Sequence, residues 1–166
     1  FWLFGVIFAG LLLNIFLDTI RLKEKIYEKF KDFTVWSLVL VVILSSFGSA
    51  IIVRHQTSPT YQAHDILIQQ EIAIRYLIDG KNPYSENYFG TPLEDFNYSE
   101  TQINPALYHF VMQPFYLLFA LPFSFVSGAL FGYFDGRIPL VFLLLVSLFI
   151  GFSLLKDGEK RRSFML

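Results

Sequence analysis

Apolar residues occur along this chain in long unbroken runs rather than in the short patterns of a soluble domain. A helix needs about 20 such residues to cross a hydrocarbon layer of about 30 Å. The runs do not alternate with a period of two, which argues against a closed barrel. The pattern predicts an all-α, polytopic membrane fold whose four apolar segments lie at positions 1–17, 33–53, about 106–131 and 138–155.

Composition supports this class. Of 166 residues, 54% are hydrophobic and 16% are charged, whereas soluble domains have about 25% charged residues. The net charge of −1 argues against nucleic-acid binding, and the absence of cysteine excludes disulfides and thiolate chemistry. The sequence opens inside an apolar run without a basic segment or a cleavage site, so we expect no signal peptide and interpret the chain as the front part of a larger protein.

Charge predicts the orientation only in part. The loop 18–32 carries five Lys or Arg residues and is expected in the cytoplasm, which leaves the acidic loop 54–105 outside. Two further transmembrane segments within 106–155 would then leave the basic tail, 156–166, outside, against the same rule. Pro105, Pro114 and Pro122 favour a short, bent or re-entrant third segment, and truncation of the chain is the other explanation.

Within the long loop, residues 65–79 have the period of an amphipathic helix. Apolar side chains fall on one face and polar ones, including Gln69, Glu71 and Arg75, on the other. This helix is too short and too polar to cross a membrane. It is expected to lie parallel to the membrane surface or to pack against the helical bundle.

His64-Asp65 at the start of this helix has two interpretations. An aspartate there can cap the helix by accepting hydrogen bonds from free backbone N–H groups. Alternatively, Asp65 is a general base that takes a proton from an acceptor hydroxyl at the membrane surface. Position alone favours the cap.

Other polar residues of the loop are also candidates. Glu94 and Asp95 are interpreted as solvated loop charges, although either could join Asp65 around a divalent cation. The three histidines lack regular ligand spacing, so the metal question stays open. The sequon at Asn97 permits glycosylation if the loop is external.

The aromatic residues allow two roles. Tyr84, Tyr88 and Tyr98 could form a platform for a sugar ring or anchor the chain at the membrane interface. Tyr108, His109 and Gln113 stand in an apolar segment, where polar residues usually face the protein interior or a cavity. We expect Tyr108 and His109 to line the membrane side of the same site.

Several short motifs together carry a resemblance. His64-Asp65, Glu71, Asp79-Gly80-Lys81-Asn82-Pro83-Tyr84, Tyr88-Phe89-Gly90-Thr91-Pro92 and Asn104-Pro105-Ala106-Leu107-Tyr108 occur in that order. Over about residues 64–123 the chain resembles the amino-terminal part of GT-C membrane glycosyltransferases, the mannosyltransferase-like enzymes that use polyprenyl- or dolichyl-phosphate sugars. The chain departs from that family in two respects. It has two spans before the long loop, where the family usually has one. It has about four spans in all, where members of the family have eight or more.

The resemblance implies sugar transfer, with inversion, from a lipid-linked sugar phosphate to a hydroxyl acceptor at the extracytoplasmic face. It implies that Asp65 is the catalytic base, and it assigns no cofactor. The expected partners are the bilayer, the lipid-linked donor and the hydroxyl acceptor. The expected substrate-binding residues are His64, Glu71, Tyr84, Tyr88, Glu94, Asp95, Asn104, Tyr108 and His109. The alternative is a non-catalytic integral membrane protein with a docking loop. A transporter is a weaker option, because the spans hold almost no ionisable residues.

Overall fold

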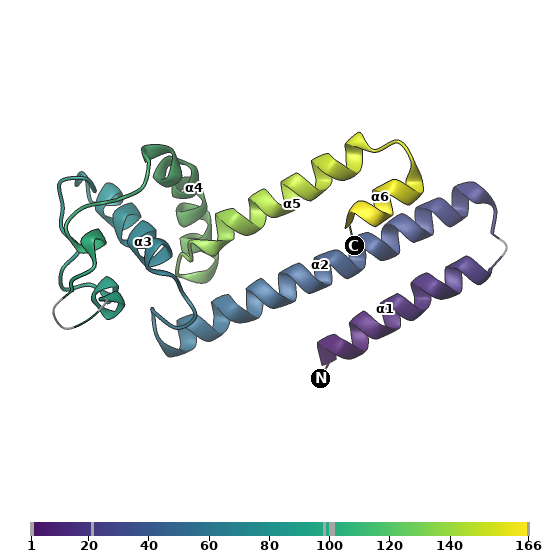
Figure 1. Ribbon diagram of the computed structural model, residues 1–166, viewed down its shortest axis with the longest axis horizontal. Helices are drawn as coiled ribbons and strands as arrows, with labels where there is room; N and C mark the ends of the chain where they lie inside the picture. The colour runs from purple at the N-terminus through teal and green to yellow at the C-terminus, as the bar shows by residue number, and fades with distance from the viewer. Residues whose placement is uncertain (1, 21, 98, 100–101, 166) are drawn as a thin grey trace. The chain divides into compact units, whose positions relative to one another are not determined.

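The computed structural model describes residues 2–20, 22–97, 99 and 102–165, and these residues form helices and loops without a strand (Figure 1). The α-helices are α1 (Trp2–Thr19), α2 (Glu24–Thr57), α3 (Asp65–Ile78), α4 (Pro114–Phe131), α5 (Arg137–Leu154) and α6 (Gly158–Met165). Two 3-10 turns, η1 (Pro92–Phe96) and η2 (Pro105–Leu107), lie between α3 and α4. The all-helical class is therefore as predicted.

Four of the described helices, α1, α2, α4 and α5, are long and apolar enough to cross a membrane. Their positions confirm the four apolar segments, but two boundaries differ. Helix α2 begins at Glu24, so most of the predicted loop 18–32 is helical. Glu and Lys are good helix formers, and an acid in the first turn is favoured by the helix dipole.

The third segment was placed too early. Residues 105–113 form a 3-10 turn and irregular chain, and α4 begins only at Pro114. Proline fits the first position of a helix because the N–H it lacks would be unpaired there. Pro122 lies inside α4.

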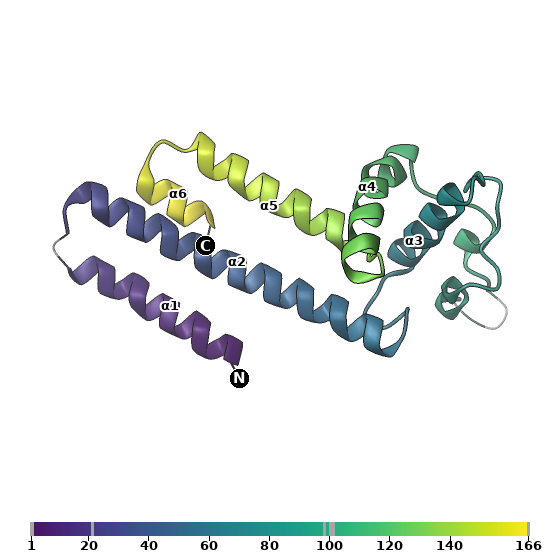
Figure 2. The same cartoon turned by 180° about the vertical axis from the view of Figure 1, so that it is seen from behind.

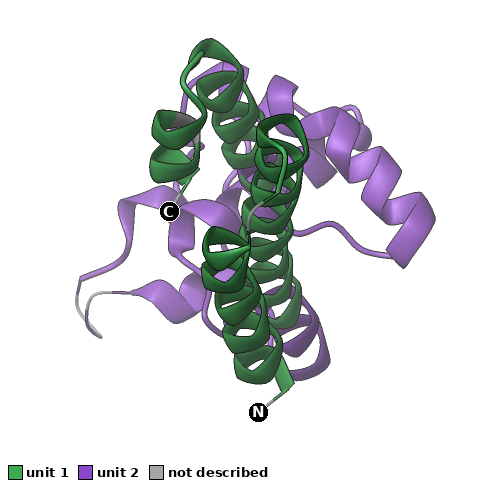
Figure 3. Cartoon of the chain, turned by 90° about the vertical axis from the view of Figure 1, so that its right-hand side faces the viewer, with its two compact units in different colours: residues 1–49, 141–166 green, residues 50–140 purple. Residues whose placement is uncertain are grey.

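The chain divides into two compact units (Figure 3). Unit 1 comprises residues 1–49 and 141–166. In it, Lys31 Nζ reaches the carbonyl and side-chain oxygens of Asn14, at 2.8 and 2.7 Å, and Asp18 at 2.7 Å. The ring of Trp36 meets that of Phe152 edge-on, with centroids 5.4 Å apart. Charged and polar contacts therefore join the start of α2 to α1, and a ring contact joins α2 to α5.

Unit 2 comprises residues 50–140 and is built around α3. Leu67 to Ile74 are all buried, and Figures 1 and 2 show α3 beside α4 from both sides. The core also contains Tyr88, Leu93, Leu107, Phe110, Leu117 and Ala120. Burial of Gln69 and Glu71 contradicts the expected solvent-facing polar face of this helix. The segment from Ala106 to Tyr116 and residues Asp135 and Gly136 cover that face, so α3 is a central helix of unit 2.

Candidate functional site

Asp65 lies at the first position of α3, directly after the cap residue His64. Its Oδ1 accepts a hydrogen bond from the backbone N–H of Ile66 at 2.7 Å and lies 2.5 Å from Nδ1 of His64. The side chain is 20% exposed. The cap is therefore His64 and not Asp65, which corrects the capping interpretation; Asp65 follows the cap, accepts a hydrogen bond at the helix start and keeps part of its side chain exposed.

Asn104 meets the other oxygen of Asp65. Its Nδ2 donates to Asp65 Oδ2 at 3.1 Å and to the Phe96 carbonyl at 3.3 Å, while its Oδ1 accepts from Ala106 N–H at 3.0 Å. Asn104 is buried. One amide side chain thus ties the start of α3 to both 3-10 turns, and two residues that the resemblance singles out are in contact.

The two described tyrosines of the proposed platform differ. Tyr88 is fully buried, its hydroxyl donates to the Pro83 carbonyl at 3.0 Å, and burial raises its pKa above the ordinary value of 10.0. Tyr88 is therefore a core residue of unit 2 with no exposed surface in this structure. Tyr84 is 40% exposed and donates to the Met112 carbonyl at 2.8 Å. Tyr98 lies outside the described residues.

The two adjacent acids are exposed and serve the loop. Glu94 Oε1 accepts from Gly90 N–H at 2.9 Å, and Asp95 Oδ2 accepts from the Thr60 hydroxyl at 3.1 Å. Neither forms a hydrogen bond with Asp65 among the described residues. Within this described part of the chain, no group of three His, Cys, Asp or Glu side chains could hold a metal ion.

Tyr108, His109 and Gln113 are exposed, which corrects the expectation that they face the interior. They belong to the irregular chain before α4 and not to an apolar helix. The backbone carbonyl of His109, in contrast, accepts a hydrogen bond from Gln69 Nε2 at 2.8 Å. In this stretch, the polar group that contacts the buried Gln69 is therefore a backbone carbonyl and not the side chain of His109.

A second polar cluster, which we call the Arg54 network, consists of Arg54, Glu71, Asp135 and Arg137. Arg54, near the end of α2, is 1% exposed. Its two terminal nitrogens each lie 2.7 Å from an oxygen of Glu71 on α3, and Nη1 also donates to Asp135 Oδ2 at 2.8 Å. Such forked pairing of guanidinium and carboxylate is the strong form of a charged hydrogen bond.

The carboxylates of this network each accept several hydrogen bonds. Glu71 Oε1 also accepts from Gly136 N–H at 2.8 Å, and Asp135 Oδ1 accepts from the backbone N–H and Nε of Arg137 at 3.0 and 2.8 Å. Burial alone would raise the pKa of Asp135, but the hydrogen bonds from Arg137 and the charge of Arg54 hold it below the ordinary value. Asp135 is therefore a structural partner of both arginines, and Glu71 accepts three hydrogen bonds from Arg54 and Gly136 in the core of unit 2.

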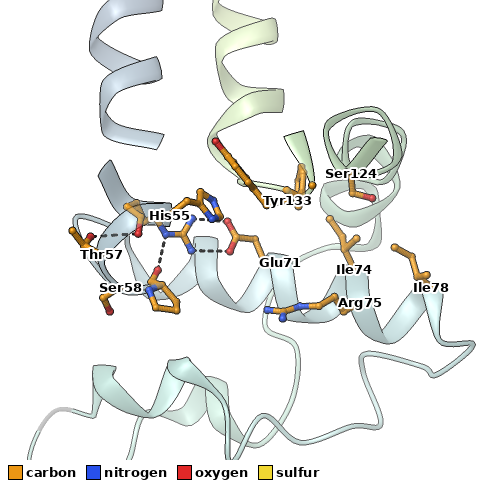
Figure 4. Close-up of a pocket in the computed structure, with 14 residues that line it drawn as sticks. His55, Thr57, Ser58, Glu71, Ile74, Arg75, Ile78, Ser124 and Tyr133 are labelled. Carbon is orange, nitrogen blue, oxygen red and sulfur yellow. Dashed lines mark hydrogen bonds and ion pairs between the residues drawn. The ribbon is translucent and has the colours of Figure 1, made fainter. Parts of the chain in front are cut away.

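A cavity of about 500 Å³ lies beside this network (Figure 4). Its polar lining includes His55, Ser58 and Arg75, and its apolar lining includes Ile74 and Ile78. The His55 ring stacks on Tyr133, with centroids 3.7 Å apart. Asp65 is not among its lining residues, so the cavity and the predicted base are separate features of unit 2.

Sequence reasoning missed Arg54, Asp135 and Arg137. The signal was present at the borders of the apolar runs, because Arg54 follows the charge-free run 33–53 and Asp135 follows 101–134. Opposite charges at the ends of different apolar segments are candidates for a buried pair when those ends meet.

Among the expected site residues, the structure thus joins Asp65, His64 and Asn104, and leaves Glu94, Asp95 and His109 outside that contact. Comparison of the chain with family models, curated proteins and solved structures found no match. Function is therefore inferred from the geometry of the described residues and from the resemblance at residues 64–123.

Proposed function

We propose that this chain is part of a GT-C-type membrane glycosyltransferase in which Asp65 is the general base. The observation that carries the proposal is the hydrogen bond between Asp65 Oδ2 and Asn104 Nδ2, at 3.1 Å. It joins two residues, 39 positions apart, that belong to separate motifs of the resemblance. Such a contact is expected if these motifs build one site.

The surroundings of Asp65 suit a base. A carboxylate has about four lone-pair positions, and the contacts with Ile66, His64 and Asn104 occupy three of them. One position remains for the hydroxyl of an acceptor, and the side chain is partly exposed. The fixed contacts would hold the carboxylate in one orientation, which is what positioning a general base requires.

In the proposed reaction, Asp65 takes the proton of the acceptor hydroxyl as its oxygen attacks the anomeric carbon of the donor. The bond between that carbon and the phosphate oxygen breaks, and the lipid phosphate leaves with the bonding electrons. The sugar is transferred with inversion. Tyr84, exposed on the same unit, is the aromatic residue proposed to contact a sugar ring.

The proposed site lies on the extracytoplasmic side of the membrane. The segment between α1 and α2 and the start of α2 are rich in lysine, which favours the cytoplasm for them. One crossing by α2 then brings residues 58–64 and the start of α3 to the outside. This placement would let a lipid-linked donor reach Asp65 from the bilayer.

The test is transfer by the complete protein carrying Asp65→Asn, assayed in membranes with a panel of polyprenyl-phosphate sugars. Asp79→Asn is the matched control, because Asp79 is exposed at the other end of α3. We expect loss of transfer in Asp65→Asn, unchanged transfer in Asp79→Asn and equal membrane insertion of both. Undiminished transfer by Asp65→Asn would overturn its role as base. An unmodified protein that uses no donor would favour the docking-loop alternative.

A further inference from the structure

The first turn of α4 and the chain that follows α4 both lie close to one side chain of α3, Gln70. Nε2 of Gln70 on α3 donates to the carbonyl of Tyr116, in the first turn of α4, at 3.1 Å. Oε1 of Gln70 lies 2.7 Å from the position that a Cβ on Gly136 would take, five residues after α4 ends. The first turn of α4 and the chain five residues after its end therefore lie beside one amide group, which a helix that crosses the membrane and continues on the opposite face does not allow.

A second set of contacts holds the end of α2 to the start of α5. Arg54 and Asp135 form a buried ion pair at 2.8 Å, and Arg137 Nη2 donates to the carbonyl of Ala50 at 3.3 Å. Both contacts lie within unit 2. In a membrane that α2 and α5 cross, the chain after α2 and the chain before α5 would therefore lie on one face.

An independent set of contacts in unit 1 joins the other ends of the same two helices. Arg162 on α6, which follows α5, lies 2.5 Å from Glu28 and 3.3 Å from Asp32, both near the start of α2. In such a membrane the basic tail and the basic segment before α2 would share a face, and α2 and α5 would cross in opposite directions with no crossing between them.

We propose that α4 is a surface helix that contacts the bilayer with its apolar face and does not cross it. This arrangement removes the conflict in the charge pattern, because it places both Lys- and Arg-rich segments on the cytoplasmic face. It concerns the path of the chain and holds whether or not the protein transfers sugars.

The side chains of α4 divide accordingly. Its buried positions, Leu117, Ala120, Ser124 and Ser127, follow a helical period and form the protein-facing side. Its exposed side chains include the large apolar residues Phe115, Leu118, Phe125, Val126, Leu130 and Phe131. Positions 101–134 contain no charged residue. Hydrocarbon of the leaflet next to unit 2 is the partner that this face fits.

The native chain contains no cysteine, so single cysteines can report the face directly. Gly132→Cys and Ala129→Cys mark the end of α4, and both positions are exposed. Ser85→Cys is the reference for the face of α3, and Thr19→Cys and Ser163→Cys are references for the opposite face; all three positions are exposed. Right-side-out membranes are treated with an impermeant maleimide, before and after permeabilisation.

We expect the α4 cysteines to be modified with Ser85→Cys, and Thr19→Cys and Ser163→Cys to be modified together only after permeabilisation. The proposal would be overturned if both α4 cysteines, like Thr19→Cys, were modified only after permeabilisation. Depth gives a second readout through bimane labels at Leu118→Cys and Val126→Cys, about 12 Å apart along the helix axis. Equal quenching by a shallow lipid-attached quencher supports a surface helix, and a strong difference in quenching between the two contradicts it.

Discussion

Arg54 and Asp135 are 81 residues apart in the chain and form a buried ion pair of 2.8 Å. Each stands at the border of a charge-free run, and Glu71 of α3 binds the same guanidinium. Taking charges out of water costs free energy, which close pairing and further hydrogen bonds must offset. The contribution of this ion pair to stability therefore depends on the presence of every residue of the Arg54 network. The network holds the end of α2, the middle of α3 and the start of α5 together.

Replacing Arg54 by Met should destabilise unit 2 by about 3–5 kcal/mol, because Glu71 and Asp135 would remain buried without their shared partner. The measurement is chemical unfolding in detergent. Arg75→Met is the matched control, since Arg75 lies on the same cavity, is exposed and forms no ion pair among the described residues. Equal stability of the two variants would show that the Arg54 network contributes little.

Acid should weaken the same network. The pKa of Asp135 is held below its ordinary value of 3.8, so its pairing stabilises the fold above that pH and the contribution is lost as the pH falls through the lowered pKa. Unfolding midpoints measured between about pH 6 and pH 2 should therefore fall at the acid end. In Asp135→Asn this part of the decline should be absent, and an unchanged acid dependence would argue against the assignment.

Asn104→Ala should cost about 1–3 kcal/mol, because the buried N–H of Ala106 and carbonyl of Phe96 would lose a hydrogen-bond partner. Under the proposed function it should also lower transfer by releasing Asp65. Gln113→Ala is the control, as Gln113 is exposed and its side chain makes no cap hydrogen bond. Wild-type stability together with reduced transfer would separate a positioning role from a structural one.

The positions of the helices could be predicted from the sequence where hydrophobic runs or helical periodicity mark them. Charge-free runs located α1, α2 and α5, and the period of 65–79 located α3, found at Asp65–Ile78. The start of α2 was missed because Glu24 to Asp32 is polar and helical at once. Hydrophobicity reports burial in lipid, whereas helix formation in this stretch depends on residue propensity.

The candidate site was predictable only in part. Asp65 and Asn104 belong to motifs of one resemblance, and their contact could be anticipated from it. The Arg54 network was missed, because charges at the borders of apolar runs mark Arg54 and Asp135 only as candidates, and periodicity carries no information on which of these borders meet. For the same reason Glu71 was assigned to a solvent-facing side, although Arg54 and Gly136 bind it in the core.

Gly136 provides a test of the packing between the start of α5 and α3. A Cβ at this position would lie 2.7 Å from Gln70 Oε1 and 3.1 Å from Leu67 Cγ, closer than van der Waals contact allows. Gly136→Ala should therefore displace the hydrogen bond from Gly136 N–H to Glu71 and cost about 1–3 kcal/mol, as overpacking does. Gly128→Ala is the matched control, because no atom lies within 4 Å of its Cβ position and alanine is favoured over glycine within a helix by about 1 kcal/mol. Thermal unfolding in detergent should then shift in opposite directions for the two variants. A Gly136→Ala protein as stable as the wild type would mean that the chain before α5 is not packed against α3, and the placement of the chain after α4 beside Gln70 would fail with it.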